Sequence, residues 1–561
     1  MTSEETVTLK FIVTSDVHGF FLPYDFIERR PAPGTMARVS SYIKREREIY
    51  GDRLILLDNG DILQGQPICN YFNTIKTGVT NIASEVINYL GYDACTIGNH
   101  DIETGHSVYD KWAAETHCPV VAANIIDTGS GKPYFKPYTM IERHGVRIAI
   151  LGMVTPAIPN WLNKRLWSGM HFESIETSTK AWLALIKEKE APDLVIGLFH
   201  SGWNGGISTT HYNEDEVERV ARNVPGIDVI FFGHDHTARQ VTIQDATSSG
   251  VVCLNPSCNA RAVATAEITI KKADGTIISK EVSGTVTDIT GEQPDENFEK
   301  HFEKAGKEVM DFCNRRIGRM ESSICTNDCF YGSAPFTDFI HNLQLSITNA
   351  DISFNAPLTF NTRIEEGDIH VSDMFKLYRY ENQIYVLKMT GREIKGYLEM
   401  SYGLWTDTMS SPSDHIMLME TDSKGGRTRY RFKNLTFNFD SAAGIDYDVD
   451  VTKPAGERIR IKGLSNGRQF APEAWYTVAM NSYRGNGGGE LLTKGAGIPA
   501  AQLAGRIVWQ SRKDQRQCLM EEIELMGNIA ATPNNNWRFV PEAWATEAIR
   551  RDKRLLSGAG Y

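Results

Sequence analysis

The sequence lacks a long hydrophobic segment: no apolar run approaches the ~20 residues that a membrane-spanning helix needs. The N-terminus, MTSEETVTLKF, also lacks the basic region and apolar core of a secretory signal peptide. We therefore expect no membrane span and a cytoplasmic location for the chain as it stands. The alternative is a periplasmic or extracellular protein from which a signal has been removed.

Positive charge is scarce as well. The chain has 59 Lys and Arg against 70 Asp and Glu, which gives a formal net charge of −11. Proteins that bind polymeric nucleic acid usually carry a basic face, so we expect no such partner. A small anionic substrate is compatible with this charge, because bound metal ions reverse the local field. We expect a monomer.

Cysteine is sparse, with nine in 561 residues. An odd number in so long a chain favours reduced thiols over a disulfide framework. Cys325 and Cys329 form a C-x3-C pair that could bind a metal or form a disulfide. No second pair lies nearby in the sequence, so we interpret them as two ordinary thiols.

The chain is too long for one hydrophobic core and is expected to form at least two domains. Residues 1–293 alternate apolar, β-branched runs with helical segments, which predicts a layered α/β domain. Residues 294–316 form a charged amphipathic segment that predicts a linker helix. Residues 317–561 have strands and helices of their own and predict a second domain.

Five short polar clusters in the first domain each follow an apolar run that is typical of a buried strand. Singly, each has a simpler explanation, such as a turn residue or a buried histidine. Together they indicate one site, since carboxylates and imidazoles suit Mn, Fe, Zn or Co, and two such ions promote in-line phosphoryl displacement. The sequence therefore predicts a metal-dependent hydrolase. The clusters read Asp16-Val17-His18, Gly60-Asp61, Gly98-Asn99-His100-Asp101, His200-Ser201-Gly202 and Gly233-His234-Asp235-His236.

In order and spacing, these D-x-H, GD, GNHD, H-S-G and GHDH segments resemble the calcineurin-like metallophosphoesterase signature. The second half resembles the 5′-nucleotidase C-terminal domain. The chain as a whole resembles the bacterial 5′-nucleotidases and 2′,3′-cyclic-nucleotide 2′-phosphodiesterases. The resemblance implies an α/β fold in which a four-layer α/β/β/α domain is joined by a helix to a smaller α/β domain. It also implies two divalent metal ions (Mn, Zn, Fe, Co or Mg).

The resemblance further implies the ligands of both ions, with Asp61 shared between them. One ion would be held by Asp16, His18, Asp61 and His236, and the other by Asp61, Asn99, His200 and His234. His100 would act on the phosphate as a catalytic residue. In the 5′-nucleotidases an aspartate in the segment GNHEFD orients this histidine. Glu103 occupies that position here, and Asp101 is the competing candidate.

Two aromatic loops in the second domain are candidates for binding a nucleobase, because stacking on a ring contributes about 1–3 kcal/mol per base. The alternative is that these rings are core residues at strand ends. The segments FNFD and NSYRGNGG resemble the YNFD-like and NNYRAYGG-like segments of the cyclic phosphodiesterase branch. The resemblance implies a base held between Phe437 and Tyr483. Further candidates are Phe439 and Asn481 near the base, and Arg363 and Arg484 near the phosphate.

We therefore expect a two-metal phosphoester hydrolase that acts on nucleotides. Its substrates would be 2′,3′-cyclic nucleotides and 3′-nucleotides, 5′-nucleotides, or both, and the aromatic loops favour the first group. The alternative within the enzymes is hydrolysis of UDP-sugars or other nucleotide pyrophosphates. The alternative of another class is a nucleotide-binding protein without catalytic activity. If metals and base bind in different domains, the helix over 294–316 would mark a hinge.

Overall fold

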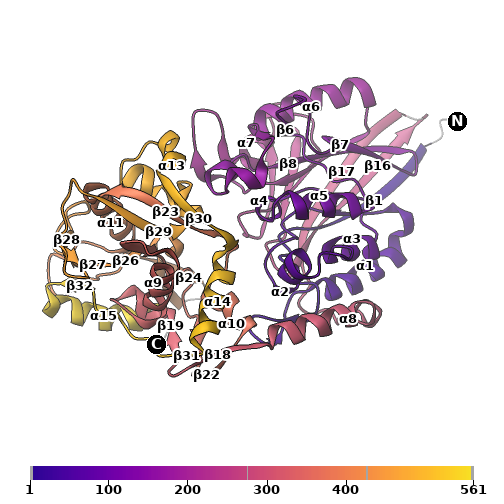
Figure 1. Ribbon diagram of the computed structural model, residues 1–561. Coiled ribbons are helices and arrows are strands. Elements are labelled where there is room, and N and C mark those ends of the chain that lie inside the picture. Colours follow the sequence, from indigo (N-terminus) through magenta and orange to yellow (C-terminus); the bar gives the residue numbers. More distant parts are fainter. Residues whose placement is uncertain (1–3, 275, 425–426, 558–561) are drawn as a thin grey trace. The chain divides into compact units, whose positions relative to one another are not determined.

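The computed structural model describes residues 4–274, 276–424 and 427–557, and it divides into two compact units, Met1–Cys313 and Asn314–Tyr561 (Figure 1). Among the described residues, no helix combines the length and the apolar character that crossing a membrane requires. All nine cysteines are free thiols, including Cys325 and Cys329. The cytoplasmic location stays a prediction.

The first unit contains two main β-sheets. The first sheet has the strand order β17-β16-β1-β4-β5, with bounds Thr276–Asp288, Ala262–Ala273, Glu4–Thr14, Leu54–Asp58 and Ala94–Cys95. The second has the order β14-β15-β13-β10-β8-β7, with bounds Arg239–Gln244, Gly250–Asn255, Val229–Phe232, Leu194–His200, Val146–Val154 and Tyr138–Arg143. Short strands complete the unit: β2 (Tyr24–Asp25), β3 (Arg30–Pro31), β6 (Ile125–Asp127), β9 (Met170–Phe172), β11 (Gly205–Ser208) and β12 (Asn213–Asp215).

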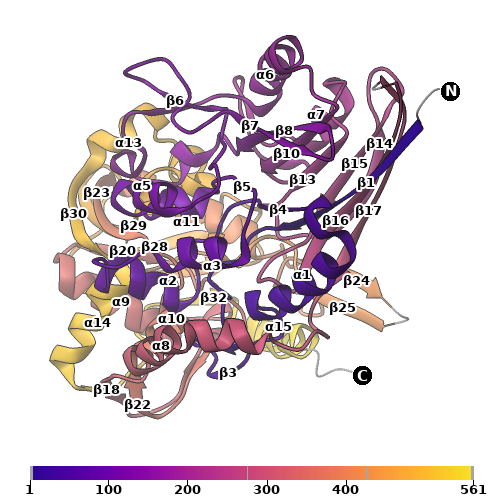
Figure 2. The ribbon, with the colours of Figure 1, turned by 90° about the vertical axis from the view of Figure 1, so that its right-hand side faces the viewer.

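The two sheets pack face to face over a fully apolar core, which includes Phe11 of β1 and Phe231 of β13 with ring centroids 6.3 Å apart. Helices cover the outer faces of both sheets, so the unit has the expected four layers, α/β/β/α (Figure 2). On the first sheet lie α1 (Met36–Tyr50), α2 (Pro67–Asn70), α3 (Ile82–Leu90), α4 (Asn99–Glu103), α5 (His106–Glu115) and α8 (Glu296–Cys313). On the second lie α6 (Ile175–Glu190) and α7 (Val217–Asn223).

The central strands of each sheet are parallel, and this arrangement brings the polar clusters to the same edge of the sheets. In the first sheet β1, β4 and β5 run in the same direction, and in the second so do β8, β10, β13 and β15. Four clusters begin within three residues of the ends of β1, β4, β5 and β13, and the fourth cluster in the chain begins at His200, the last residue of β10. Because the carboxyl ends of parallel strands lie at one edge of a sheet, segments more than 200 residues apart in sequence reach the same place.

Helix α8, the predicted linker, belongs to the first unit. Its buried side chains Phe298, Phe302 and Val309 lie in the core between the first sheet and its helices. The ring of Tyr89 on α3 contacts Phe298 edge to face, with centroids 5.5 Å apart. The division between the units falls at the C-terminal end of α8, after Cys313.

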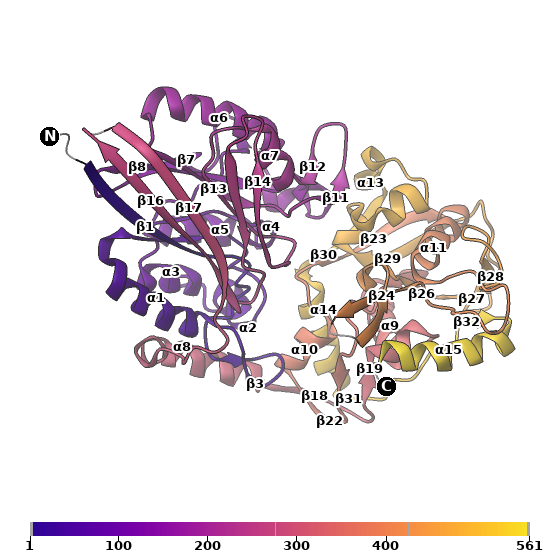
Figure 3. The same ribbon diagram turned by 180° about the vertical axis from the view of Figure 1, so that it is seen from behind.

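The second unit is built on a five-stranded sheet with the order β26-β20-β29-β23-β30 and an aromatic-rich core (Figure 3). Those strands are Ser441–Ala443, Ile352–Asn355, Trp475–Asn481, Gln383–Thr390 and Ile507–Asp514. Other strands are β18 (Arg316–Met320), β19 (Ile324–Cys325), β21 (Arg363–Ile364), β22 (Gly367–His370), β24 (Met419–Lys424), β25 (Arg427–Phe432), β27 (Ile445–Asp450), β28 (Ile459–Leu464), β31 (Asn528–Ile529) and β32 (Trp537–Val540). The helices are α9 (Pro335–Thr348), α10 (Val371–Leu377), α11 (Gly391–Trp405), α12 (Ser482–Gly485), α13 (Ala500–Arg506), α14 (Gln515–Met526) and α15 (Glu542–Leu556).

The packing of α8 gives a test of its place in the first unit. Phe298→Ala removes a fully buried ring and should lower the free energy of unfolding by about 3–5 kcal/mol, measured by denaturant titration. Glu303→Ala, on the exposed side of the same helix, is the control and should leave the transition unchanged. A Phe298→Ala protein that unfolds like the wild type would mean that α8 is a detached linker.

Candidate active site

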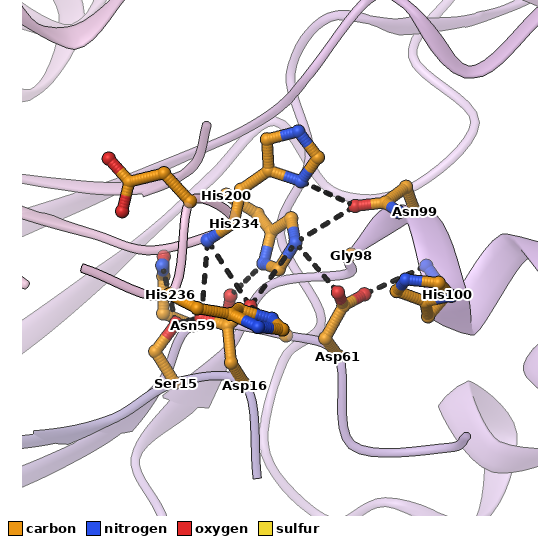
Figure 4. A network of polar contacts seen from close by, with 12 residues as sticks. Ser15, Asp16, Asn59, Asp61, Gly98, Asn99, His100, His200, His234 and His236 are labelled. Carbon is orange, nitrogen blue, oxygen red and sulfur yellow. Dashed lines mark hydrogen bonds and ion pairs between the residues drawn. The ribbon is translucent and has the colours of Figure 1, made fainter. Parts of the chain in front are cut away.

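The structure brings all seven predicted ligand side chains together where the strands of the two sheets end. All of them except His18 are labelled in Figure 4. One group consists of Asp16, His18, Asp61 and His236, whose potential ligand atoms lie within 4.8 Å of one another. In this group Nε2 of His18 lies 3.0 Å from Nε2 of His236. The same His236 nitrogen lies 3.2 Å from Oδ1 of Asp16.

A second group surrounds His200 and shares Asp61 with the first. Nε2 of His200 lies 3.1 Å from Oδ2 of Asp61 and 3.2 Å from Oδ1 of Asn99. Nδ1 of His234 lies 2.8 Å from the same Asn99 oxygen. Asp61 thus contacts members of both groups, which is the position expected for a residue shared between two ions.

The other ring nitrogen of three of these histidines contacts an acceptor on the side away from the cluster. Nδ1 of His18 lies 3.0 Å from the carbonyl oxygen of Gln64, and Nδ1 of His200 lies 2.7 Å from that of Asn59. Nε2 of His234 lies 3.1 Å from a carboxylate oxygen of Glu214. A hydrogen bond of this kind fixes the tautomer, so that the remaining nitrogen presents a lone pair.

The donor chemistry of the cluster fits divalent cations. Imidazole nitrogens lie about 3 Å from one another and from carboxylate and amide oxygens. Oδ2 of Asp61 is buried without a hydrogen bond of good geometry, although Nε2 of His200 lies 3.1 Å away. Burying such groups without a compensating partner is unfavourable, and a cation bound among them provides that partner. Mixed imidazole and carboxylate ligands suit Mn, Fe, Zn or Co better than Mg, which prefers oxygen ligands.

The electrostatics of the cluster also favour positive charge. Burial alone would lower the pKa of His200, but the carboxylates of Asp61 and Asp16 raise it to about 10. Burial likewise opposes the charge of His236, yet hydrogen bonding to Asp16 contributes to raising its pKa to about 11. Burial and the neighbouring His236 lower the pKa of His18 to about 3, so this ring stays neutral. Two buried carboxylates thus attract cations into a site that also holds a neutral imidazole.

Most of the seven residues have strained backbone conformations. A positive φ is uncommon outside glycine and costs of the order of 1–3 kcal/mol for each residue. Such strain persists only where the surrounding structure enforces it, and it concentrates at functional sites. Five of the seven have φ between 49° and 72°: Asp16, His18, Asp61, His234 and His236.

Glycines of the motifs make room for the carboxylates. A Cβ atom on Gly98 would lie 2.0 Å from Oδ1 of Asp61, and one on Gly233 would lie 2.3 Å from Oδ2 of Asp16. Each carboxylate therefore packs directly against the backbone of a different cluster. The glycines before Asn99 and His234 are thus a steric requirement of the site.

His100 lies on α4, with Glu103 one turn later on the same face. Nδ1 of His100 lies 2.6 Å from Oε2 of Glu103, while its backbone N–H donates to Oδ1 of Asp61 at 2.8 Å. Burial opposes the charged form of His100, but the two carboxylates raise its pKa to about 9. Glu103 is therefore the carboxylate in position to orient this ring.

Asp101 has a different role from the one considered for it. Its two oxygens accept hydrogen bonds from four backbone N–H groups, those of Asp61, Ile62, Leu63 and Gly98. The side chain is fully buried. Its assignment as the orienter of His100 is therefore wrong, because this carboxylate instead holds the Asp61 turn against Gly98.

Glu214, in β12, is a site residue that the sequence motifs do not indicate. Glu214 contacts His234. Together with Asp215 and His234 it also forms a further set of side chains that could hold a metal ion. The ring of Trp161 stacks on His234, with centroids 5.7 Å apart. In the sequence, this residue is signalled by the acidic run at 214–216, which lies between the histidines of two motifs.

In the second unit the rings of Phe437 and Tyr483 lie side by side, with centroids 6.2 Å apart and planes at 89°. Both side chains are half-buried. Phe439 is fully buried and stacks on Trp405 in the core, with centroids 5.5 Å apart. A ring enclosed in this way is not available to a substrate, so the assignment of Phe439 to base binding is wrong.

The three polar candidates of this unit occupy different surroundings. The side-chain oxygen of Asn481 accepts the backbone N–H of Arg484 and caps α12. Arg484 is buried and forms an ion pair with Asp440, which rules out the expected phosphate contact. Arg363 is exposed on β21 and forms an ion pair with Glu365 at 2.8 Å.

Comparison with known proteins agrees with this arrangement. Residues 9–238 match the model of the calcineurin-like phosphoesterases, and residues 316–494 match that of the 5′-nucleotidase C-terminal domain. The chain belongs to the two-domain family of bacterial 5′-nucleotidases and 2′,3′-cyclic-nucleotide phosphodiesterases. The expected fold and family are thereby confirmed.

Two relatives align with 95% of this chain. The trifunctional nucleotide phosphoesterase protein YfkN of Bacillus subtilis is 27% identical, and the chain spans 39% of its length. A 2′,3′-cyclic-nucleotide 2′-phosphodiesterase/3′-nucleotidase of Yersinia enterocolitica is 25% identical and is covered over 88% of its length. The crystal structure of a 5′-nucleotidase precursor from Thermus thermophilus has the same fold, with a TM-score of 0.66, 19% identity and coverage of 96% of this chain and 100% of that one.

The contact between Glu214 and His234 gives a test of the metal site. Glu214→Gln should weaken metal binding about 10- to 100-fold, because the histidine loses the carboxylate that orients it. Calorimetric titration of the chelator-treated protein with Mn²⁺ measures this. The matched control is Glu218→Gln, which removes an ion pair with Arg222 nearby. Equal affinities for Glu214→Gln and the wild type would contradict the role of Glu214.

Proposed function

We propose that this protein is a two-metal phosphoester hydrolase of nucleotides. The observation that carries the proposal is the convergence of seven carboxylate, imidazole and amide side chains from five strand ends, with Asp61 between the other six. Asp61 would be the ligand shared by the two ions. The other ligands would be Asp16, His18 and His236 for one ion and Asn99, His200 and His234 for the other. When bound, such ions lower the pKa of a water molecule and neutralise charge on phosphoryl oxygens.

His100 is the proposed catalytic residue beside the metals. Its bond to Glu103 holds Nδ1, so Nε2 is the nitrogen that would face the substrate. Burial opposes the charged form of this ring, but the carboxylates of Asp61 and Glu103 raise its pKa to about 9, which favours the protonated form. It can therefore stabilise charge that develops on the phosphoryl group or donate the proton to the leaving oxygen.

The proposed substrates are 2′,3′-cyclic nucleotides and 3′-nucleotides, with 5′-nucleotides as a further class. The names of the relatives support this choice, in particular that of the Yersinia enterocolitica enzyme, which aligns over most of its length. Phe437 and Tyr483 are the proposed base-binding rings, because they are neighbouring and only half-buried. In the edge-to-face arrangement a base can stack on either ring, while a sandwich requires one ring to turn.

The proposal is tested with chelator-stripped protein and a panel of substrates. Mn²⁺, Zn²⁺, Co²⁺ and Mg²⁺ are added separately, and hydrolysis of 5′-, 3′- and 2′,3′-cyclic nucleotides and of UDP-glucose is followed by chromatography of the products. We expect metal-dependent turnover of the cyclic and 3′ compounds. Turnover of UDP-glucose alone would support the pyrophosphate alternative. Nucleotide binding without turnover under any ion would support a non-catalytic protein.

Base recognition is tested by Tyr483→Ala. Loss of stacking should raise KM for a nucleotide about 5- to 100-fold, since one ring contributes about 1–3 kcal/mol. KM for p-nitrophenyl phosphate, which has no base, should change much less. Steady-state kinetics on both substrates measures the difference. An equal change for both would remove Tyr483 from base recognition.

A further inference from the structure

The second unit contains an arginine that is almost completely buried and carries no evident role in catalysis. Arg484 is 1% exposed, although a charged guanidinium is normally found at the surface. We propose that Arg484 and Asp440 form a positioning pair. The pair sets the relative position of the rings Phe437 and Tyr483 and thereby determines how strongly the enzyme prefers nucleotides to other phosphoesters. This inference rests on the proposed function.

The guanidinium of Arg484 can donate five N–H bonds, and the structure provides an acceptor for each. Nε and Nη2 donate to the two carboxylate oxygens of Asp440, at 3.1 and 2.9 Å. Nη2 also donates to the carbonyl oxygen of Phe437 at 2.8 Å. Nη1 donates to the Asn438 side chain at 3.2 Å and to the carbonyl oxygen of Gly488 at 2.6 Å. Because every donor has its acceptor, this side chain is a connector between segments.

These contacts join the two aromatic loops directly. One acceptor is the carbonyl group of Phe437 itself, so the guanidinium fixes the backbone that carries the first ring. The guanidinium carbon also lies 5.4 Å from the centroid of the Tyr483 ring, within the range of a cation–π contact. A single planar group therefore contacts the backbone of one base-binding residue and the ring of the other.

The glycines beside Tyr483 fit the same arrangement. A Cβ atom on Gly488 would lie 2.6 Å from the ring of Tyr483, and one on Gly489 would lie 2.2 Å from Nη1 of Arg484. Gly489 also has φ of 68°, which a larger residue adopts only with strain. The glycine-rich turn thus lets the backbone close over both the ring and the guanidinium.

Asp440 connects this pair to the core of the unit. Its side chain accepts a hydrogen bond from the hydroxyl group of Tyr397, and its carbonyl oxygen accepts one from Ser401 at 2.8 Å. Both donors lie on α11. The ring of Tyr397 stacks on Phe354 of β20, with centroids 4.2 Å apart and planes at 7°. The pair is therefore anchored to a helix and a central strand, which makes it a rigid reference for the two loops.

A buried ion pair is seldom more stabilising than apolar residues of the same volume, because both charges lose their hydration. Stability alone therefore does not account for this pair. The geometry of the pair accounts for it, because the planar guanidinium of arginine binds a carboxylate at two points and still has donors for two backbone carbonyl groups. Lysine has one ammonium group and cannot contact all five acceptors.

The experiment compares Arg484→Lys and Asp440→Asn with the wild type. The measured quantity is the ratio of kcat/KM for 3′-AMP to kcat/KM for p-nitrophenyl phosphate, together with the Kd of adenosine, which binds without a phosphate. We expect the ratio to fall about tenfold in each variant through a higher KM for the nucleotide, with a parallel rise in the Kd of adenosine. Circular dichroism and thermal melting establish that each variant is folded.

Two further variants complete the design. Asn438→Ala removes only one of the five acceptors from a half-buried position, so it tests the pair even if the other variants do not fold. It should lower the same ratio about threefold. Arg506→Lys is the matched control, because Arg506 also forms a two-point ion pair, with Glu393, and lies 4.8 Å from the ring of Trp475. It should leave the ratio unchanged.

The outcomes separate this inference from the proposed function. One outcome is that Tyr483→Ala loses the preference for 3′-AMP while the folded variants of the other three positions, Arg484→Lys, Asp440→Asn and Asn438→Ala, keep it. This outcome overturns the positioning role and leaves base stacking by Tyr483 supported. If Arg506→Lys lowers the ratio as much as Arg484→Lys, the effect is a general consequence of disturbing the unit, and the inference also fails. If the wild type itself does not prefer 3′-AMP to p-nitrophenyl phosphate, base recognition fails and this inference fails with it, whereas metal-dependent hydrolysis of phosphoesters is unaffected.

Discussion

The first unit depends on the balance of charge around two buried carboxylates, Asp16 and Asp61, whose negative charge requires positive charge nearby. Both are fully enclosed, and both carry pKa values below the ordinary range despite burial, because imidazoles surround them. Net negative charge in an apolar interior is stable only beside cations. The parallel strands, the strained turns and the close-packed glycines can all be understood as the means of bringing the ligands to these two oxygen donors.

Both units bury charged side chains, but the buried charges have a different role in each unit. In the first, buried charges are arranged with lone pairs facing inward, which suits a site for cations. In the second, the buried charges of Arg484 and Asp440 neutralise each other and every donor is bonded, which suits a rigid support. In the first unit a buried oxygen of Asp61 lacks a well-formed hydrogen bond among the candidate ligands, whereas all donors of Arg484 in the second unit are bonded.

The ligand cluster could be predicted from sequence because its residues follow apolar strands, and the ends of parallel strands coincide in space. The roles of Asp101, Phe439 and Arg484 could not, because each depends on burial and on partners far away in the chain. Asp101 is adjacent to His100 in sequence but faces the backbone of the Asp61 turn. Phe439 is fully buried whereas Phe437, two residues earlier, is half-buried, and the sequence contains no signal for that difference. Helix α8 has the charge pattern of a linker, yet its apolar side packs into the core.

The central claim is that two divalent ions bind on either side of Asp61. Anomalous scattering from crystals of the Mn²⁺-loaded protein tests it most directly. We predict two strong anomalous peaks in the first unit, each within coordination distance of an Asp61 oxygen and a histidine nitrogen. A single peak that does not contact Asp61, or the absence of any peak at saturating Mn²⁺, would contradict the account.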